Sequence, residues 1–215
     1  MSSFTDVQLS RALAVLVAFH VVVIAASNYL VQIPFQVLGL HTTWGTFSFP
    51  LVYLATDLTV RIFGKGQARK IIFLTMIPAL LISYLVSILF FEGHFQGLGV
   101  LAVFNFFVFR IAFASFIAYL AGQLLDVKVF SRLREHRSWW VAPGASTIVG
   151  NLVDTILFYS IAFWASSDAF MALYWPEIAA VDYCFKIVVS MLLFLPAYGV
   201  LLNLLTETMM REGGK

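Results

Sequence analysis

Six long apolar runs constrain the fold more than any other feature of this sequence. About 20 helical residues, each rising about 1.5 Å, cross a bilayer core roughly 30 Å thick. Runs of that length, bounded by charged residues, lie at approximately 11–33, 46–64, 70–91, 100–125, 141–165 and 178–206. Only 11% of the residues are charged and 61% are hydrophobic, whereas a soluble domain has roughly 25% and 45–50%. The sequence predicts an all-α integral membrane protein, with residues 1–215 as one six-helix transmembrane domain.

The segments that connect these runs differ in charge. Ten basic residues lie near the two chain ends and in the segments after the second and fourth runs: Arg11, Lys65, Arg69, Lys70, Lys128, Arg132, Arg134, Arg137, Arg211 and Lys215. The segments after the first, third and fifth runs contain neither Lys nor Arg. Because Lys and Arg are enriched in cytoplasmic loops, both termini are predicted to be cytoplasmic.

Six charged residues lie inside the apolar runs: Asp57, Arg61, Arg110, Asp154, Asp182 and Lys186. At roughly 2.5–3.5 kcal/mol each, six lipid-facing charges would cost about 15–20 kcal/mol, more than the ~5–15 kcal/mol that stabilises a typical fold. They must therefore face into the bundle. Asp57 and Arg61, and likewise Asp182 and Lys186, are spaced i,i+4 and could neutralise each other as structural pairs. Asp154 and Arg110 have no such neighbour, so their partners must come from other helices or from a ligand.

Uncharged polar residues extend the same helix faces. They are Thr147 and Asn151 beside Asp154, Ser190 beside Lys186, and Ser27, Asn28 and Gln32 in the first run. Three polar faces on three helices predict a shared polar cavity. Arg110 and Asp154 are expected about 15 Å and 20 Å into their spans, near the middle of the membrane, where secondary transporters bind substrate. Helices one to three and four to six could form two inverted three-helix repeats.

Signatures of membrane enzymes are missing from the sequence. The four histidines do not form the H-E-x-x-H pattern of a zinc protease, and there is neither a G-x-S-x-G elbow nor a Walker A loop. The single cysteine, Cys184, cannot form an internal disulfide. We therefore expect no enzyme activity, no cofactor and no metal. Energy coupling is left open: an ion gradient, metabolic trapping or a separate ATPase would each serve.

Five segments carry a family resemblance that covers about residues 20–203. They are 27–32 (SNYLVQ), 41–45 (HTTWG), 55–64 (ATDLTVRIFG), 150–155 (GNLVDT) and 181–186 (VDYCFK). Together they resemble the queuosine precursor transporter family, which is itself similar to vitamin uptake transporters. The resemblance implies a multi-pass importer in the bacterial inner (cytoplasmic) membrane. Its substrates would be 7-cyano-7-deazaguanine and, as a second precursor, 7-aminomethyl-7-deazaguanine, both used for tRNA modification.

The chemistry of a deazaguanine suggests roles for the buried polar residues. A carboxylate accepts from two adjacent donors, so Asp154 or Asp57 is expected to bind the N1–H and 2-amino edge, and Arg110 or Lys186 to donate to the carbonyl. An aromatic side chain would stack on the ring, with Trp44, Phe47, Phe49 and Tyr183 as candidates. The predicted substrate-binding set is Asn28, Gln32, Trp44, Phe49, Asp57, Asn105, Arg110, Asn151, Asp154, Asp182, Tyr183 and Lys186.

The partners expected are the small-molecule deazaguanine and the lipid bilayer, with no nucleic acid; a homo-oligomer is left open. Two other interpretations compete with the transporter. One is a vitamin-binding membrane subunit of an energy-coupling-factor type importer, which needs a partner ATPase. The other is a membrane enzyme or scaffold whose six buried charges form structural ion pairs.

Overall fold

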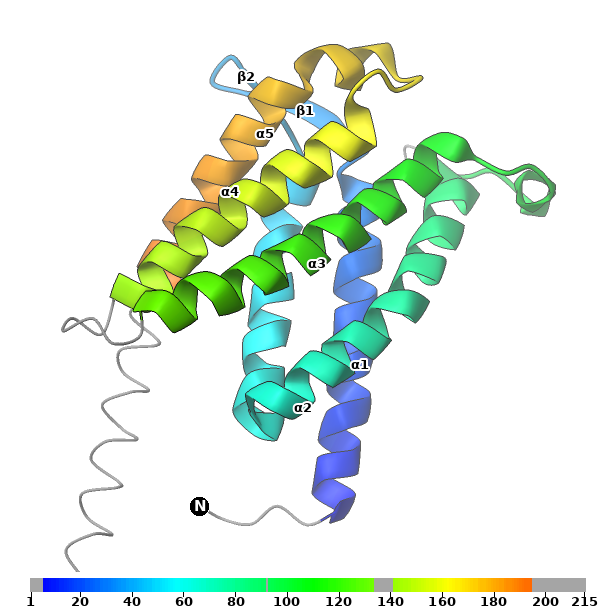
Figure 1. Cartoon of the computed structure of the whole chain (residues 1–215). Coiled ribbons are helices and arrows are strands. Elements are labelled where there is room, and N and C mark those ends of the chain that lie inside the picture. Colours follow the sequence, from blue (N-terminus) through cyan, green and yellow to red (C-terminus); the bar gives the residue numbers. More distant parts are fainter. Residues whose placement is uncertain (1–5, 92, 134–140, 195–215) are drawn as a thin grey trace, which may run out of the picture.

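The computed structural model describes residues 6–91, 93–133 and 141–194, together with most of their side chains (Figure 1). Five α-helices account for most of these residues: α1 (Asp6–Leu30), α2 (Gly45–Leu89), α3 (Phe106–Leu133), α4 (Val141–Phe163) and α5 (Ala169–Val189). A 3-10 turn, Leu98–Ala102, precedes α3, and a π-helical turn, Ser190–Phe194, follows α5. The chain is mostly helical, as its apolar runs predict.

Two short antiparallel hairpins depart from the all-α prediction. Strands β1 (Pro34–Val37) and β2 (Leu40–Thr43) pair directly after α1, and strands β3 (Phe90–Phe91) and β4 (His94–Phe95) pair directly after α2. Both hairpins turn through glycines with positive φ, Gly39 and Gly93, a conformation that glycine adopts without steric cost. Strand β3 takes up the last two residues of the predicted run 70–91, and residues 31–33 form turns before the first hairpin, so the two helices end at Leu89 and Leu30, two and three residues earlier than expected.

The long helix α2 consists of two arms. Gly64 has φ 75° and ψ 159°, which are not helical values, and the chain reverses there at the lower end of Figure 1. The arms correspond to the second and third predicted runs, 46–64 and 70–91. The break falls at glycine because this backbone conformation is strained for any residue with a Cβ.

The predicted fourth run, 100–125, is wrong at its start. The helix begins at Phe106, because residues 98–102 form the 3-10 turn and the Asn105 side chain accepts a hydrogen bond from Val108 N at 3.1 Å, a helix-capping contact. The fifth run, 141–165, matches α4 to within two residues. The sixth, 178–206, begins inside α5, nine residues after that helix starts, and its part beyond residue 194 lies outside the described residues.

The helices pack through small and apolar side chains. α1 lies along α2, α3 lies along α4, and α5 contacts α4 and strand β2. The larger core cluster joins α3, α4, α5 and the residue that follows α1 through Val31, Ile111, Ala114, Ala118, Phe158, Tyr159, Ala162, Phe163, Met171, Ile178 and Ala179. The alanines let α3 approach its neighbours closely, as small residues do in membrane helices. This cluster encloses the polar residues described below.

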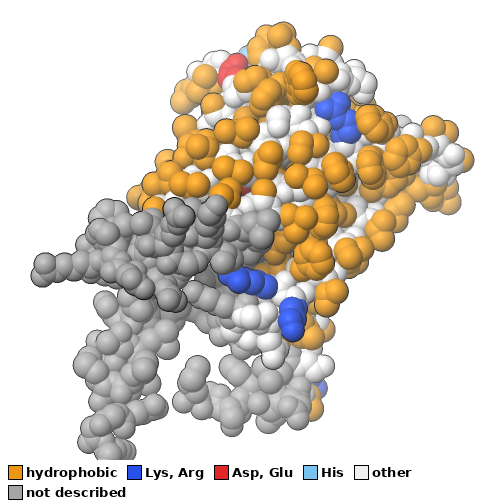
Figure 2. All heavy atoms as spheres, viewed as in Figure 1, with side chains coloured by type: hydrophobic (Ala, Val, Ile, Leu, Met, Phe, Trp, Pro, Cys, Tyr) orange, Lys and Arg blue, Asp and Glu red, His pale blue; other side chains and the backbone are white. Residues whose placement is uncertain are grey.

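The outer surface of the described chain is strongly apolar. Figure 2 shows hydrophobic side chains over most of this face, with charged side chains in only a few places. Two helical segments, Ser10–Leu30 and Gly66–Leu89, are long and apolar enough to cross a bilayer, and Phe106–Gly122 and Thr147–Phe163 are shorter apolar stretches. A surface of this kind suits contact with lipid.

Candidate functional site

Lys186 lies between two carboxylates in the interior of the protein. Its Nζ is 2.8 Å from Asp182 Oδ2 and 3.2 Å from Asp154 Oδ2, and it donates to Thr155 Oγ1 at 3.2 Å. The side chains of Lys186 and Asp182 are 1% and 0% exposed, whereas that of Asp154 is 27% exposed. These four residues, Asp154, Thr155, Asp182 and Lys186, are called the Lys186 cluster below. It joins α4 to α5.

The cluster shows which charged residues pair with Lys186 and with Asp154. The i,i+4 pair of Asp182 and Lys186 forms as expected, but it is not self-contained, because the lysine is shared with Asp154. The partner of Asp154 comes from another helix, as predicted. A buried ion pair contributes little net stability once desolvation is counted. Two carboxylates around one buried ammonium are therefore better explained by a function than by stability.

Three buried hydroxyl residues surround the cluster. The phenol of Tyr159 is fully buried, with Asp182, Lys186, Thr43 and Thr46 as its polar neighbours. Thr46 also lies beside the Asp182 carboxylate. Thr43 and Thr46 lie within hydrogen-bonding reach of the Tyr159 phenol, although neither contact is well aligned, and among the described residues Asp182 Oδ1 has no hydrogen-bond partner. Because buried polar atoms are nearly always paired, the poorly satisfied polar groups around the cluster need an explanation.

The three hydroxyl residues, Thr43, Thr46 and Tyr159, were not predicted from the sequence. Each type is common in membrane helices as a packing residue, so no single one attracts notice. One sequence feature could have pointed to Thr43: Thr42 and Thr43 end strand β2, directly before Trp44, which was itself a candidate. Only the folded hairpin brings this segment against α4 and α5.

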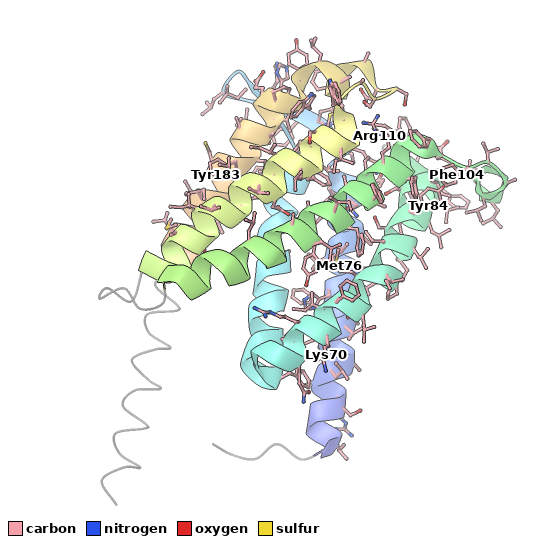
Figure 3. All side chains as sticks on the ribbon, in the orientation of Figure 1. Lys70, Met76, Tyr84, Phe104, Arg110 and Tyr183 are labelled. Atoms are coloured by element: carbon pink, nitrogen blue, oxygen red, sulfur yellow. The ribbon has the colours of Figure 1, made fainter. Side chains whose placement is uncertain are left out.

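Arg110 of α3 lies at the C-terminal end of α4, away from Asn151 in the middle of that helix. Its guanidinium donates to the carbonyl oxygens of Ile161 (2.8 and 3.0 Å), Trp164 (2.7 Å) and Ala165 (3.4 Å). Figure 3 shows Arg110 near the upper end of α3, beside the end of α4. Since α3 begins only four residues earlier, at Phe106, Arg110 lies about 6 Å along its helix and not the expected ~15 Å. Through these contacts Arg110 caps the C-terminus of α4, which is a structural role.

The polar patch of α1 divides between two neighbours. Asn28 is buried and its Oδ1 accepts a hydrogen bond from the Ser115 hydroxyl of α3, while its Nδ2 has no partner among the described residues. Gln32 donates to the backbone carbonyl of Asn28 at 2.9 Å. The structure therefore joins Asn28 to α3, and no contact with the Lys186 cluster is recorded for it or for Gln32.

The remaining predicted residues have varied places. Asn105 is exposed and caps α3. Tyr183 donates to the Ile148 carbonyl of α4 at 3.4 Å, and Figure 3 shows it on α5. Trp44 stacks on Phe35 of the first hairpin with ring centroids 4.7 Å apart. Asn151 is buried on α4.

Two predicted residues, Phe49 and Asp57, belong to the first arm of α2, but their side chains are outside those that the structure describes. The same is true of Arg61, so the Asp57/Arg61 pair stays a prediction. Within the described part of the chain, no group of three or more His, Cys, Asp or Glu residues is placed to hold a metal ion.

A second polar contact fixes the first hairpin to α5. Glu177 Oε1 accepts from the backbone N–H of His41 at 2.7 Å, and both its carboxylate oxygens lie 3.2 Å from His41 Nδ1. Glu177 directly precedes the sixth apolar run. The pKa of the Glu177 carboxyl is lowered, chiefly by the hydrogen bond from the backbone N–H of His41 and secondly by the His41 side chain. The His41 ring packs on Tyr174 with centroids 4.1 Å apart. This contact holds Thr43 against α5.

Comparison with known proteins shows which family the chain is similar to. The profile of a family described as "Putative vitamin uptake transporter" matches residues 43–201. An Escherichia coli (strain K12) protein named "Queuosine precursor transporter" is 62% identical over 207 residues, which cover 96% of this chain and 94% of that protein.

Two further relatives carry the name "Probable queuosine precursor transporter". The Haemophilus influenzae protein is 53% identical over 94% of this chain and 91% of its own length. The Bacillus subtilis protein is 30% identical over 76% of this chain and 73% of its own length. No solved structure matches the chain.

Proposed function

Since this chain belongs to the queuosine precursor transporter family, we propose that it imports 7-cyano-7-deazaguanine, and also 7-aminomethyl-7-deazaguanine, across the bacterial inner membrane for tRNA modification. The family is one of transporters, so the chain is not an enzyme, as its sequence predicted. The vitamin-binding subunit gains no support from relatives that are named for queuosine precursors.

We place the substrate at Asp154, on the partly exposed side of the Lys186 cluster. The observation that carries this proposal is the partly exposed carboxylate of Asp154 against buried Lys186, whose other side is lined by Asp182 and the buried phenol of Tyr159. In the proposed topology six spans cross the bilayer with both termini in the cytoplasm, and the cluster is reached between the first hairpin, α4 and α5. The proposal thereby puts the substrate near the membrane midplane, where secondary transporters bind theirs.

Asp154 is the carboxylate best placed to bind the substrate. Only its Oδ2 is held by Lys186, and its side chain is 27% exposed, so lone pairs remain for two adjacent N–H donors. The N1–H and 2-amino groups of a deazaguanine provide such a pair of donors. The buried hydroxyls of Tyr159 and Thr43, which lie against each other, would donate to the ring carbonyl. Asp182 is fully buried and its carboxylate contacts the same lysine, so we assign it no substrate contact.

The first experiment measures uptake of labelled 7-cyano-7-deazaguanine into cells that neither make it nor have another importer, read as queuosine in tRNA. Wild type is expected to restore queuosine and Asp154→Asn to lose it. The matched control is Asp168→Asn, the same chemical change at the N-cap of α5, where Asn caps as well as Asp. Failure of wild type would reject the substrate, and unimpaired Asp154→Asn would remove that residue from the site.

A second experiment tests the contact itself on purified protein. A saturating ligand, at a hundredfold excess over Kd, stabilises a protein by about 2.7 kcal/mol. The analogue without the 2-amino group should bind at least about tenfold more weakly than 7-cyano-7-deazaguanine, because one hydrogen bond to a charged group is lost. In Asp154→Asn this difference should shrink. An unchanged preference in the variant would place the 2-amino group elsewhere.

A further inference from the structure

We infer that Asp182 carries a proton into the cell together with each substrate molecule, and that Lys186 couples the two. This inference rests on the proposed import function and specifies what drives it. The argument begins with charge. Among the described side chains, the Lys186 cluster holds two carboxylates and one ammonium, so it has an excess negative charge unless one carboxyl binds a proton.

The groups that face Asp182 come from every element packed against α5. From α4 they are Asp154, Thr155 and Tyr159. From the start of α2 it is the hydroxyl of Thr46, and α5 itself supplies Lys186, while Thr43 of strand β2 lies beside Tyr159.

The other ionisable pair of this region, His41 and Glu177, is engaged at the hairpin, more than one helical turn from Asp182 along α5. Within the described residues, Lys186 is thus the only cation recorded at Asp182. A buried charge that shares its counter-ion is costly in a bilayer. Protonation of Asp182 removes this cost, and the Lys186 ammonium then pairs with the Asp154 carboxylate.

The two carboxylates are not equivalent, and this decides which one carries the proton. Asp182 is fully buried and its Oδ1 has no hydrogen-bond donor among the described residues, whereas Asp154 is partly exposed. Water or substrate can stabilise the charge of Asp154, but neither reaches Asp182. The proton therefore belongs on Asp182, and the substrate on Asp154.

A chain of hydroxyl groups leads from the first hairpin toward Asp182. Thr42 Oγ1 lies 3.1 Å from Thr46 Oγ1, and Thr46 lies beside the Asp182 carboxylate. Both threonines are buried. Hydroxyls accept and donate protons, so this path can pass a proton from the hairpin end of the bundle to the cluster.

The cycle follows from the charges. A proton from outside binds a carboxylate oxygen of Asp182, the neutral substrate binds at Asp154, and the loaded cluster has no excess charge. On the cytoplasmic side the substrate and the proton are released to water. The empty cluster then returns with its negative charge. Each cycle moves one positive charge inward, so both an acidic exterior and an inside-negative potential should drive uptake.

The test uses purified protein in liposomes and labelled 7-cyano-7-deazaguanine. With the outside one pH unit more acidic, wild type should accumulate substrate up to about tenfold, since a tenfold ratio corresponds to one unit of proton gradient at one proton per substrate. A protonophore should abolish the accumulation but not exchange between internal and external substrate. Asp182→Asn should keep exchange and lose accumulation, whereas Asp168→Asn should keep both.

Several results would overturn the inference without touching import. If wild type exchanges substrate but the internal concentration never exceeds the external one, the protein is a facilitator. Accumulation driven by a sodium gradient at equal pH would make the coupling ion Na⁺. If Asp182→Asn does not fold, wild type alone gives the answer, because a trapped pH dye must report proton entry when substrate is added. Wild type with neither binding nor exchange would instead reject the proposed function.

Discussion

Replacing Arg110 separates a structural role from a substrate-binding role. Arg110→Met removes the short hydrogen bonds to the carbonyls of Ile161 (2.8 Å) and Trp164 (2.7 Å). A hydrogen bond to a charged group contributes about 1.5–3 kcal/mol. Taking the lower value, because the guanidinium is partly exposed, two bonds give about 3 kcal/mol. For a chain of this size the expected fall in Tm is about 6–12 °C.

The assay is thermal unfolding of the purified protein, with substrate binding measured well below Tm. Arg110→Met should lower Tm while the Kd for 7-cyano-7-deazaguanine stays within about twofold. Arg110→Lys keeps the charge but has one ammonium in place of the guanidinium fork, so it should lose about half as much stability. A variant with wild-type Tm and a Kd raised tenfold would refute the helix-capping role and return Arg110 to the substrate site.

Three further predictions concern other parts of the chain. Lys186→Met leaves buried carboxylates without their cation and should cost about 3–5 kcal/mol in denaturation experiments; adding Asp182→Asn should restore part of that loss. Glu177→Gln should increase hydrogen exchange in the first hairpin. In wild type the same loosening should appear as pH falls below 4.5, because a lowered pKa confines the stabilising contribution to higher pH. Gly45→Ala should destabilise by about 1–3 kcal/mol, since the new Cβ would lie 2.9 Å from a neighbouring side chain, whereas Gly150→Ala, with nothing within 4 Å, should not.

The apolar runs predicted the helices well because a membrane helix is a composition signal that needs no knowledge of contacts. Their ends were predicted less well. The start of α3 depends on a single hydrogen bond that the Asn105 side chain accepts, and α1 ends in turns where Gln32 and Ile33 donate to the carbonyls of Tyr29 and Leu30. Such local contacts decide a boundary without changing the average hydrophobicity of the run.

The pairing of charges was predictable only in part. Helical spacing identified Asp182 with Lys186 and showed that Asp154 needs a partner elsewhere, both of which the structure confirms. It could not name that partner, because spacing relates residues on one helix only. For the same reason Arg110 looked like a substrate ligand: its partners are backbone carbonyls, which every residue has and no sequence pattern marks.

Burial distinguishes the two acidic residues that the sequence treats alike. Asp154 and Asp182 each lie within an apolar run, yet one carboxylate is 27% exposed and the other 0%. An exposed carboxylate can exchange water for substrate at little cost, and a fully buried one can change only by gaining or losing a proton. Because Lys186 contacts both, a change at either carboxylate alters how strongly the lysine is held by the other. Any variant that gives Lys186 a single carboxylate partner should therefore uncouple substrate movement from the proton gradient, even where binding survives.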